Sequence, residues 1–420
     1  MEPSEIREPG LVRRLAIDLG PLRRHPPFRR LFVGQTISTF GSEIAAVAAP
    51  FQLYQLTHST LQVGLLSLCE LFPLLTLTIV GGAIADAIDK RKLLLVTEVL
   101  LAFVALGFAF NASLDQPRVW AIYVLVTVAM SIFSLGVAGM SSTIPRLVGD
   151  NELSAAIAIE NVYGSTTNVA GPALGGVLIA VLGLKGAYLL DAATFTASLW
   201  SVWRLPALAP AHDAERPSLR TIAEGFRFVR KRKVLLGMFL VDSNAMVFGM
   251  PRALFPALAL NRFNGGAGVL GLMYAAPYAG ALAASLVSGW TAHARRQGLI
   301  VCIAAALWGL AIAFFGFAET LWVALLLLAV AGAADNVSAV LRGTILWRVT
   351  PDPLRGRVSG IEFAQVAATP ALGNVEAGLV ASLTTVRFSI VSGGLLCILG
   401  TVVIALAVPA FTRYDARAPG

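Results

Sequence analysis

The sequence predicts an all-α integral membrane protein with twelve transmembrane helices in two six-helix halves. Three observations lead to this prediction: a shortage of charge, long apolar runs and an internal repeat. Of the 420 residues, 57% are apolar and 13% are charged, whereas soluble proteins carry about 25% charged residues. Such a chain cannot cover a water-facing surface with charge. Soluble enzymes, soluble nucleic-acid binders and disordered proteins are therefore excluded.

Apolar runs long enough to cross ~30 Å of hydrocarbon, about 20 residues at 1.5 Å per residue, recur through the whole chain. Helices are the form expected for runs of this length, because every backbone polar group must be satisfied inside the segment and barrel strands would be near ten residues. We predict twelve spans, at residues 28–56, 62–84, 93–111, 119–141, 153–182, 185–203, 234–257, 267–290, 299–317, 321–347, 358–382 and 386–410.

The basic residues fall on one side of these spans. Of the 32 lysines and arginines, 27 lie on the side of the N-terminus and 5 on the other, which is the positive-inside pattern. We therefore expect a multi-pass protein of a bacterial cytoplasmic membrane, with both termini cytoplasmic. The net charge of +8 then reflects topology, and we expect no nucleic-acid partner.

The same pattern sets the expected domain organisation. We predict a cytoplasmic N-terminal segment (1–27), a first six-helix half (28–203), a cytoplasmic linker (204–233), a second half (234–410) and a cytoplasmic tail (411–420). Within the linker, residues 220–233 read RTIAEGFRFVRKRK, a pattern typical of a basic amphipathic helix lying along the membrane interface. A plain solvated linker is the alternative.

An internal repeat relates the two halves. Placing Gly82 on Gly289 puts Asp86 on His293, and a basic cluster follows in both loops, at an offset of 207 residues. The same offset carries the start of the first span from 28 to 235, where the seventh begins. Repeats of this kind are typical of transporters with a binding site between the halves near the bilayer midplane.

The loop after the second span carries a recognisable motif, formed by Gly82, Ile84, Ala85, Asp86, Lys90 and Arg91. It resembles the loop signature G-x-L-a-D-R-x-G-R-[KR] of the major facilitator superfamily, and departs from it at Ala87 and Asp89, where the family prefers Arg and Gly. The runs HPPFRRLFVGQTISTFGS (25–42), THSTLQVG (57–64) and RGTILWRVTPDPLRGRV (342–358) resemble the drug-efflux branch, which includes siderophore exporters. The fourth span lacks the embedded arginine of many proton-coupled members, since Arg146 lies at or beyond its cytoplasmic end.

The resemblance implies a gate at this loop. The acid matching Asp86 is expected to lie near the start of the eleventh span, around Ser359, and to hold the outward-facing state. An aspartate near a helix N-terminus gains ~0.3–1 kcal/mol from the helix dipole. The alternative is that Asp86 only neutralises Lys90 or Arg91.

The fifth span contains GPALGG, with Gly171, Pro172, Gly175 and Gly176, which is similar to the antiporter signature G-P-x-x-G-G of the same superfamily. Small residues let membrane helices approach closely, and proline is tolerated where neighbours satisfy the freed carbonyl. We expect a close-packed, kinked helix between the halves that also prevents leakage.

Carboxylates within the predicted spans are the candidate coupling groups. An ionised acid at helix centre costs ~2.5–3.5 kcal/mol, so these acids should face an interior cavity or be protonated. Counted from the span ends, Glu43, Glu70, Asp242 and Asp335 lie deepest, with no lysine or arginine at comparable depth. Burial without a counter-ion favours the protonated form, as a proton carrier requires. The shallower acids Glu98, Glu160 and Glu362 are expected to pair with loop arginines or to snorkel. Asp191 lies near the external end of its span, and Glu376, in the outer half of its span, fits either a structural or a coupling role.

These features favour a secondary transporter that exports amphipathic small molecules by proton antiport, with protons, a small-molecule substrate and membrane lipid as partners. We expect a monomer without cofactor or metal. The sequence carries no catalytic constellation and no phosphate-binding G-x-x-x-x-G-K-[ST] loop, so we expect neither an enzyme nor internal ATP use. Acids without deep bases favour neutral or cationic cargo, although the resemblance also suggests siderophores, which tend to be anionic. Uptake or flipping of a metabolite or lysolipid on the same scaffold is the alternative.

Overall fold

The computed structural model of the chain describes residues 18–149, 151–206 and 219–415, and the side chains of 79–87, 138, 141–142 and 219–223 lie outside that description. Helices are the only regular secondary structure among the described residues. The predicted segments 1–27, 204–233 and 411–420 fall partly outside the described residues.

The first part of the chain forms a bundle of long helices, after the short α2 (Gly20–Arg24). Its members are α3 (Pro26–Thr57), α4 (Thr60–Ala87), α5 (Lys90–Ala112), α6 (Val119–Val148) and α7 (Leu153–Trp203). With 51 residues, α7 is too long for one crossing of ~30 Å. The backbone leaves helical geometry at Gly183, with φ 69° and ψ 173°, which glycine adopts without steric cost. The chain reverses there, and the predicted division into spans 153–182 and 185–203 is confirmed.

The second bundle follows α8 (Leu219–Lys231). It comprises α9 (Lys233–Phe248), η1 (Arg252–Leu254), α10 (Phe255–Ala257), η2 (Leu258–Arg262), α11 (Gly266–Leu286), η3 (Ser288–His293), α12 (Gln297–Phe315), α13 (Leu321–Val349), α14 (Asp352–Leu383), α15 (Val386–Ala407) and α16 (Pro409–Thr412). The helix break between α9 and η1 contains Pro251, which has no backbone N–H to continue the helix. Trp308 Nε1 donates to the Gly249 carbonyl at 2.9 Å and so satisfies one of the groups that the break frees.

Ten described helical segments are long and apolar enough to cross a membrane. One of them, α7, makes two crossings because of its reversal. The remaining crossing is α3, whose 32 residues include Gln35, Ser38 and Glu43 and are therefore less apolar. The helices thus match the predicted twelve spans, with ends shifted by several residues. Helix α6 runs to Val148, beyond the predicted 141, and α14 begins at Asp352, before the predicted 358. Helix α9 itself ends at Phe248, before the predicted 257, and short helical turns continue that span to Arg262.

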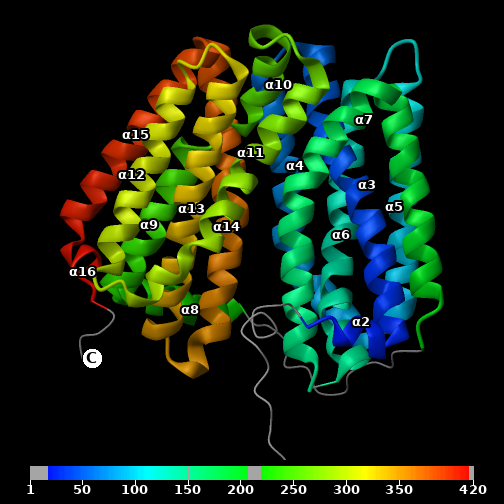
Figure 1. Cartoon of the computed structure of the whole chain (residues 1–420), viewed down its shortest axis with the longest axis horizontal. Helices are drawn as coiled ribbons and strands as arrows, with labels where there is room; N and C mark the ends of the chain where they lie inside the picture. The colour runs from blue at the N-terminus through cyan, green and yellow to red at the C-terminus, as the bar shows by residue number, and fades with distance from the viewer. Residues whose placement is uncertain (1–17, 150, 207–218, 416–420) are drawn as a thin grey trace, which may run out of the picture.

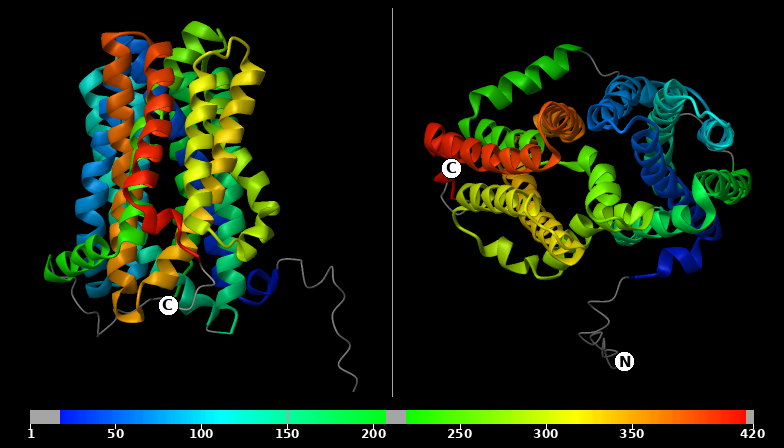
Figure 2. Two further views of the ribbon diagram at one scale, coloured as in Figure 1. Left: turned by 90° about the vertical axis from the view of Figure 1, so that its left-hand side faces the viewer. Right: turned by 90° about the horizontal axis from the view of Figure 1, so that it is seen from above.

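The two bundles stand side by side, with α2 and α16 at the same end (Figure 1). At this end α8 lies across the bundle axis (Figure 2). An ion pair of 2.6 Å between Arg357 Nη1 and Glu224 Oε2 joins α8 to the beginning of α14. The predicted helix in the linker is confirmed; its place at a membrane interface stays a prediction.

The bundles contact each other through α7 with α11 and through α4 with α14. At the first contact, Gly176 faces the backbone of Ala267 and Gly271. At the second, Thr60 Oγ1 donates to the Gly378 carbonyl at 3.0 Å. Asn261 Nδ2 also donates to the Tyr54 hydroxyl at 2.8 Å. Because α3 ends and α4 and α11 begin at the end away from the termini, these contacts join the bundles in that part of the molecule.

Candidate functional site

A cavity of about 270 Å³ lies between the two bundles. The first bundle contributes Glu43 from α3 and Glu70 and Ser67 from α4, and the second contributes Arg252 from η1 and Asn374 from α14. Two tyrosines of α11, Tyr274 and Tyr278, complete its polar and aromatic wall. The cavity therefore has acids on one side and a base on the other.

The helix break after α9 places Arg252 in this cavity. Its Nη2 donates to the Tyr278 hydroxyl at 2.7 Å, and its guanidinium carbon lies 5.1 Å from the Tyr278 ring centre and 5.7 Å from that of Tyr274. The next residue, Ala253, donates its N–H to Asn374 Oδ1 at 3.1 Å, while Asn374 Nδ2 donates to Ser67 Oγ at 2.9 Å. Asn374 thus joins η1, α14 and α4 around the arginine.

Arg252 interacts electrostatically with Glu43 and Glu70, but within the described part of the chain no carboxylate comes within 4.0 Å of its guanidinium. The guanidinium is fixed by a neutral hydroxyl and by aromatic faces, which stabilise a cation without neutralising it. It can therefore still pair with an acidic group of a ligand.

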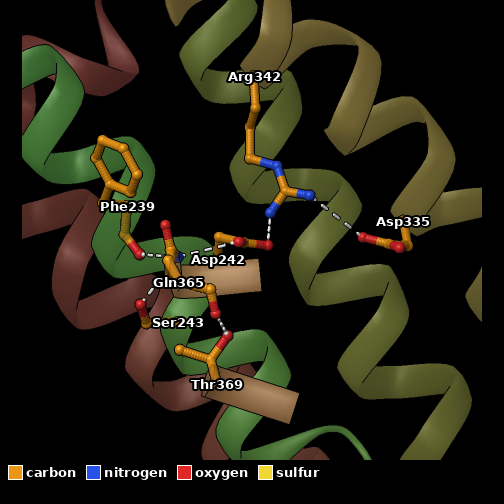
Figure 3. A network of polar contacts seen from close by, with 7 residues as sticks. All are labelled: Phe239, Asp242, Ser243, Asp335, Arg342, Gln365 and Thr369. Carbon is orange, nitrogen blue, oxygen red and sulfur yellow. Dashed lines mark hydrogen bonds and ion pairs between the residues drawn. The ribbon is translucent and has the colours of Figure 1, made fainter. Parts of the chain in front are cut away.

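A second polar site lies within the second bundle (Figure 3). Arg342 of α13 forms an ion pair with Asp242 of α9, and its Nη2 lies 3.6 Å from Asp335 Oδ1. The Asp242 and Arg342 side chains are only 7% and 12% exposed. Since an α-helix has about 3.6 residues per turn, Asp335 and Arg342 lie two turns apart on one face of α13.

Gln365 of α14 completes this network. Its Nε2 donates to Asp242 Oδ2, to the Phe239 carbonyl and to Ser243 Oγ, each at 3.0 Å. The Thr369 hydroxyl donates to the Gln365 carbonyl one turn later, at 2.9 Å. Glu362 of α14 also interacts electrostatically with Arg342. Three helices therefore meet at one buried arginine.

The expectation that no base lies at the depth of the acids is wrong. Arg252 and Arg342 both fall inside predicted spans, at 234–257 and 321–347, near the end of each span. The break after α9 turns Arg252 towards the cavity, and α13 continues to Val349, so Arg342 lies about two turns inside the helix. The signal available in the sequence was the pairing of an arginine with an acid seven residues before it, at 335 and 342.

The four deep acids occupy two separate places. Glu43 and Glu70 line the cavity between the bundles, whereas Asp242 and Asp335 meet Arg342 within the second bundle. The expectation for one of the shallower acids is wrong as well. Glu98 is 7% exposed and accepts from Gln35 Nε2 at 2.8 Å, so it neither pairs with a loop arginine nor snorkels. Asp191, expected near a span end, is 4% exposed and lies against Gly41 of α3.

The predicted gating loop is described only in part, because the side chains of Gly82 and Asp86 lie outside the described residues. Beyond them, Asp89 accepts a hydrogen bond from the Arg91 N–H at 2.9 Å and caps the start of α5. This gives a physical role to one of the departures from the family signature. Lys90 is buried, and Arg91 donates to the Trp203 carbonyl. The gate itself stays a prediction.

The glycines of the antiporter-like motif lie at close helix contacts. Gly171 and Gly175 face Glu43 and Ile44 of α3, and Gly176 faces α11 of the other bundle. Pro172 lines the cavity, and its carbonyl lies against Gly271. The motif therefore packs one bundle internally and joins it to the other, as expected for close packing between the halves.

Comparisons with known proteins identify the family of this chain. The chain matches the family described as transmembrane secretion effector over residues 16–419. It is 33% identical to the enterobactin exporter EntS of Citrobacter koseri over 391 residues, covering 93% of this chain and 94% of that protein. The Escherichia coli enterobactin exporter is also 33% identical, over 393 residues with the same coverage.

Solved structures show the same fold at low identity. A POT family transporter in complex with 5-aminolevulinic acid aligns with a TM-score of 0.73 at 13% identity, covering 92% of this chain and 97% of that one. The nucleoside transporter NupG aligns with a TM-score of 0.70 at 14% identity, covering 92% and 99%. The chain is thus a multi-pass membrane transporter and not an enzyme. It belongs to the major facilitator superfamily, in the transmembrane secretion effector family.

Proposed function

We propose that this transporter exports amphipathic small molecules, either drug-like compounds or siderophore-like metabolites, by proton antiport with alternating access. The observation that carries the proposal is the cavity between the bundles, to which both halves contribute charged side chains. A site shared by two bundles can be exposed to either side of the membrane when one bundle rocks against the other. The export direction is supported by the similarity to enterobactin exporters.

The contacts between the bundles support an inward-facing state. They lie in the part of the molecule away from the termini, and the basic residues predict cytoplasmic termini. In that orientation the outer side is closed and cargo enters the cavity from the cytoplasm. Outward opening then requires the Thr60–Gly378, Ser67–Asn374 and Tyr54–Asn261 hydrogen bonds to break.

Proton coupling is best supported at Asp242 and Arg342. A proton on Asp242 removes the negative charge that holds Arg342, whose Nη2 is already 3.6 Å from Asp335. The arginine can then move towards Asp335 and loosen the contact between α9 and α13. A buried pair with a second acceptor nearby has two discrete arrangements, which is what a switch requires.

The cavity between the bundles also bears on the charge of the cargo. Deep acids without bases favour neutral or cationic cargo, but Arg252 adds a cation held against two tyrosines. An acidic aromatic group can pair with the guanidinium and pack on the rings. Anionic siderophore-like cargo is therefore compatible with the cavity, and the similarity to enterobactin exporters supports it.

Arg252→Ala is expected to reduce export of an anionic catecholate siderophore by about 10- to 100-fold, because one charged hydrogen bond contributes ~1.5–3 kcal/mol. The measurement is accumulation in everted membrane vesicles with an imposed proton gradient, with and without a protonophore. Arg387→Ala is the matched control, since this exposed arginine packs on Phe317 outside the cavity and its loss should leave accumulation unchanged. Equal siderophore export by both variants would show that Arg252 does not bind the substrate. A lipophilic cation in the same assay tests the other class of cargo.

Asp86→Asn is expected to abolish export while the amount of protein in the membrane stays normal, because the gate depends on the charge near the start of α14. The departure at Ala87 removes one basic residue of the family signature, so Asp86 must act without it. Immunoblotting of membrane fractions provides the abundance control. Unchanged vesicle transport would show that Asp86 only balances neighbouring charge.

A further inference from the structure

A second cavity, of about 330 Å³, lies inside the first bundle. It is distinct from the cavity between the bundles, to which the proposed export function is assigned. Side chains of α3, α4, α5, α6 and α7 line it, and most of its wall is apolar. Phe108, Phe133 and Phe195 supply aromatic surface. Its size falls in the range of small-molecule pockets, ~300–1,000 Å³.

Three carboxylates interrupt this apolar wall: Glu43, Glu70 and Asp191. Asp191 is 4% exposed, and its Oδ1 has no hydrogen-bond partner among the described residues. An unpartnered buried carboxylate oxygen is rare in proteins and calls for an explanation by a ligand, an ion or a proton. No lysine, arginine or histidine is among the described residues that line the cavity.

The charge of the cavity selects its occupant. An ionised acid at this depth costs ~2.5–3.5 kcal/mol, so a bound positive charge would be stabilised by all three carboxylates. The apolar wall requires that the rest of the ligand be hydrophobic, and aromatic faces attract cations as well. Arg252, which limits the cationic preference of the cavity between the bundles, does not line this one.

We propose that this cavity is a binding site for lipophilic monovalent cations, with Asp191 as its charge-selecting residue. Glu43 and Glu70 line both cavities, so a cation here lies next to the site between the bundles. The two cavities thus differ in ligand class: hydrophobic cations inside the first bundle, and molecules with an acidic group beside Arg252.

Binding of radiolabelled tetraphenylphosphonium to the purified full-length protein in lipid nanodiscs tests the proposal. Asp191→Asn, nearly identical in shape, is expected to weaken binding by at least about tenfold, or ~1.4 kcal/mol. Ala129→Phe, which fills the cavity wall, is expected to do the same. Glu376→Gln, which removes an acid of the second bundle that is not among the described residues lining either cavity, should leave the affinity unchanged, and the neutral triphenylphosphine oxide should not compete.

The proposal is overturned if the wild-type protein does not bind the cation, or if neither cavity variant changes its affinity. Thermal unfolding of each variant separates loss of the site from loss of the fold. Because the assay needs no proton gradient, it is independent of export. Vesicles that fail to export, together with cation binding that depends on Asp191, would contradict the proposed function and leave this binding site standing.

Discussion

Replacing Asp242 by asparagine is expected to abolish proton-driven export and to destabilise the protein by ~3–5 kcal/mol, the usual effect of removing one partner from a buried ion pair. The variant leaves the Arg342 guanidinium buried, with Asp335 at 3.6 Å as its remaining ion-pair partner among the described residues. It also removes the carboxyl group that is proposed to carry the proton. Export is measured in everted vesicles over a range of imposed pH gradients, and stability by thermal unfolding in detergent.

A double variant separates these two effects. Asp242→Asn combined with Arg342→Gln removes both charges, so most of the stability should return, because a buried pair can be replaced by neutral groups at little cost. Export should stay absent, since no titratable group is restored at position 242. Glu376→Gln is the matched control, an acid of α14 that lines neither the cavity between the bundles nor the Arg342 network. If the stable double variant exported in proportion to the pH gradient, coupling would have to lie elsewhere.

Gly176→Ala is expected to have the second large effect, a shift of the conformational equilibrium away from the closed outer side. A Cβ at this position would meet the Ala267 carbonyl and the Gly271 backbone of α11, and neither can move without moving the helix. We expect α7 and α11 to separate and export to fall by at least about tenfold, because a shift of ~1.4 kcal/mol already changes an equilibrium tenfold.

Distances between the bundles provide the measurement. Spin labels at Asp115 and Glu319, in the loops after α5 and before α13, report the separation at the end away from the termini, in a background without the native cysteines. Gly164→Ala lies on the same helix, where a Cβ would meet nothing within 4 Å, and should leave both distance and export unchanged. An unchanged distance distribution in Gly176→Ala would mean that the glycine contact does not hold this state.

The sequence predicted the secondary structure because membrane insertion constrains it strongly. Twenty-residue apolar runs and the positive-inside pattern are both local or nearly local signals. The break after α9 also has a local cause, since Pro251 and Pro256 follow this helix and proline removes a backbone donor. The glycines at 171, 175 and 176 also indicated close packing correctly.

The candidate site could be predicted only as a set of acids, not as an arrangement. Counting residues from a span end gives the depth of a side chain, but neither its direction around the helix nor the helix that it faces. Asp191 seemed shallow by this count, yet it packs against Gly41 and lines an interior cavity. Glu98 likewise accepts a hydrogen bond from Gln35 on a neighbouring helix, whereas the sequence predicted pairing with a loop arginine or snorkelling.

By itself, the sequence determined the membrane class, the twelve crossings, the repeat and the presence of acids that must be compensated. Only the tertiary structure decided how they are compensated. Arg342 pairs with Asp242, and Arg252 is turned into the cavity by the break after α9. Asp191 keeps an oxygen that has no partner within the described part of the chain. The physical reason is that the bilayer requires each helix to satisfy its own backbone polar groups, which is a property of a local segment. Pairing between charged side chains depends instead on distances between helices that are far apart in the sequence.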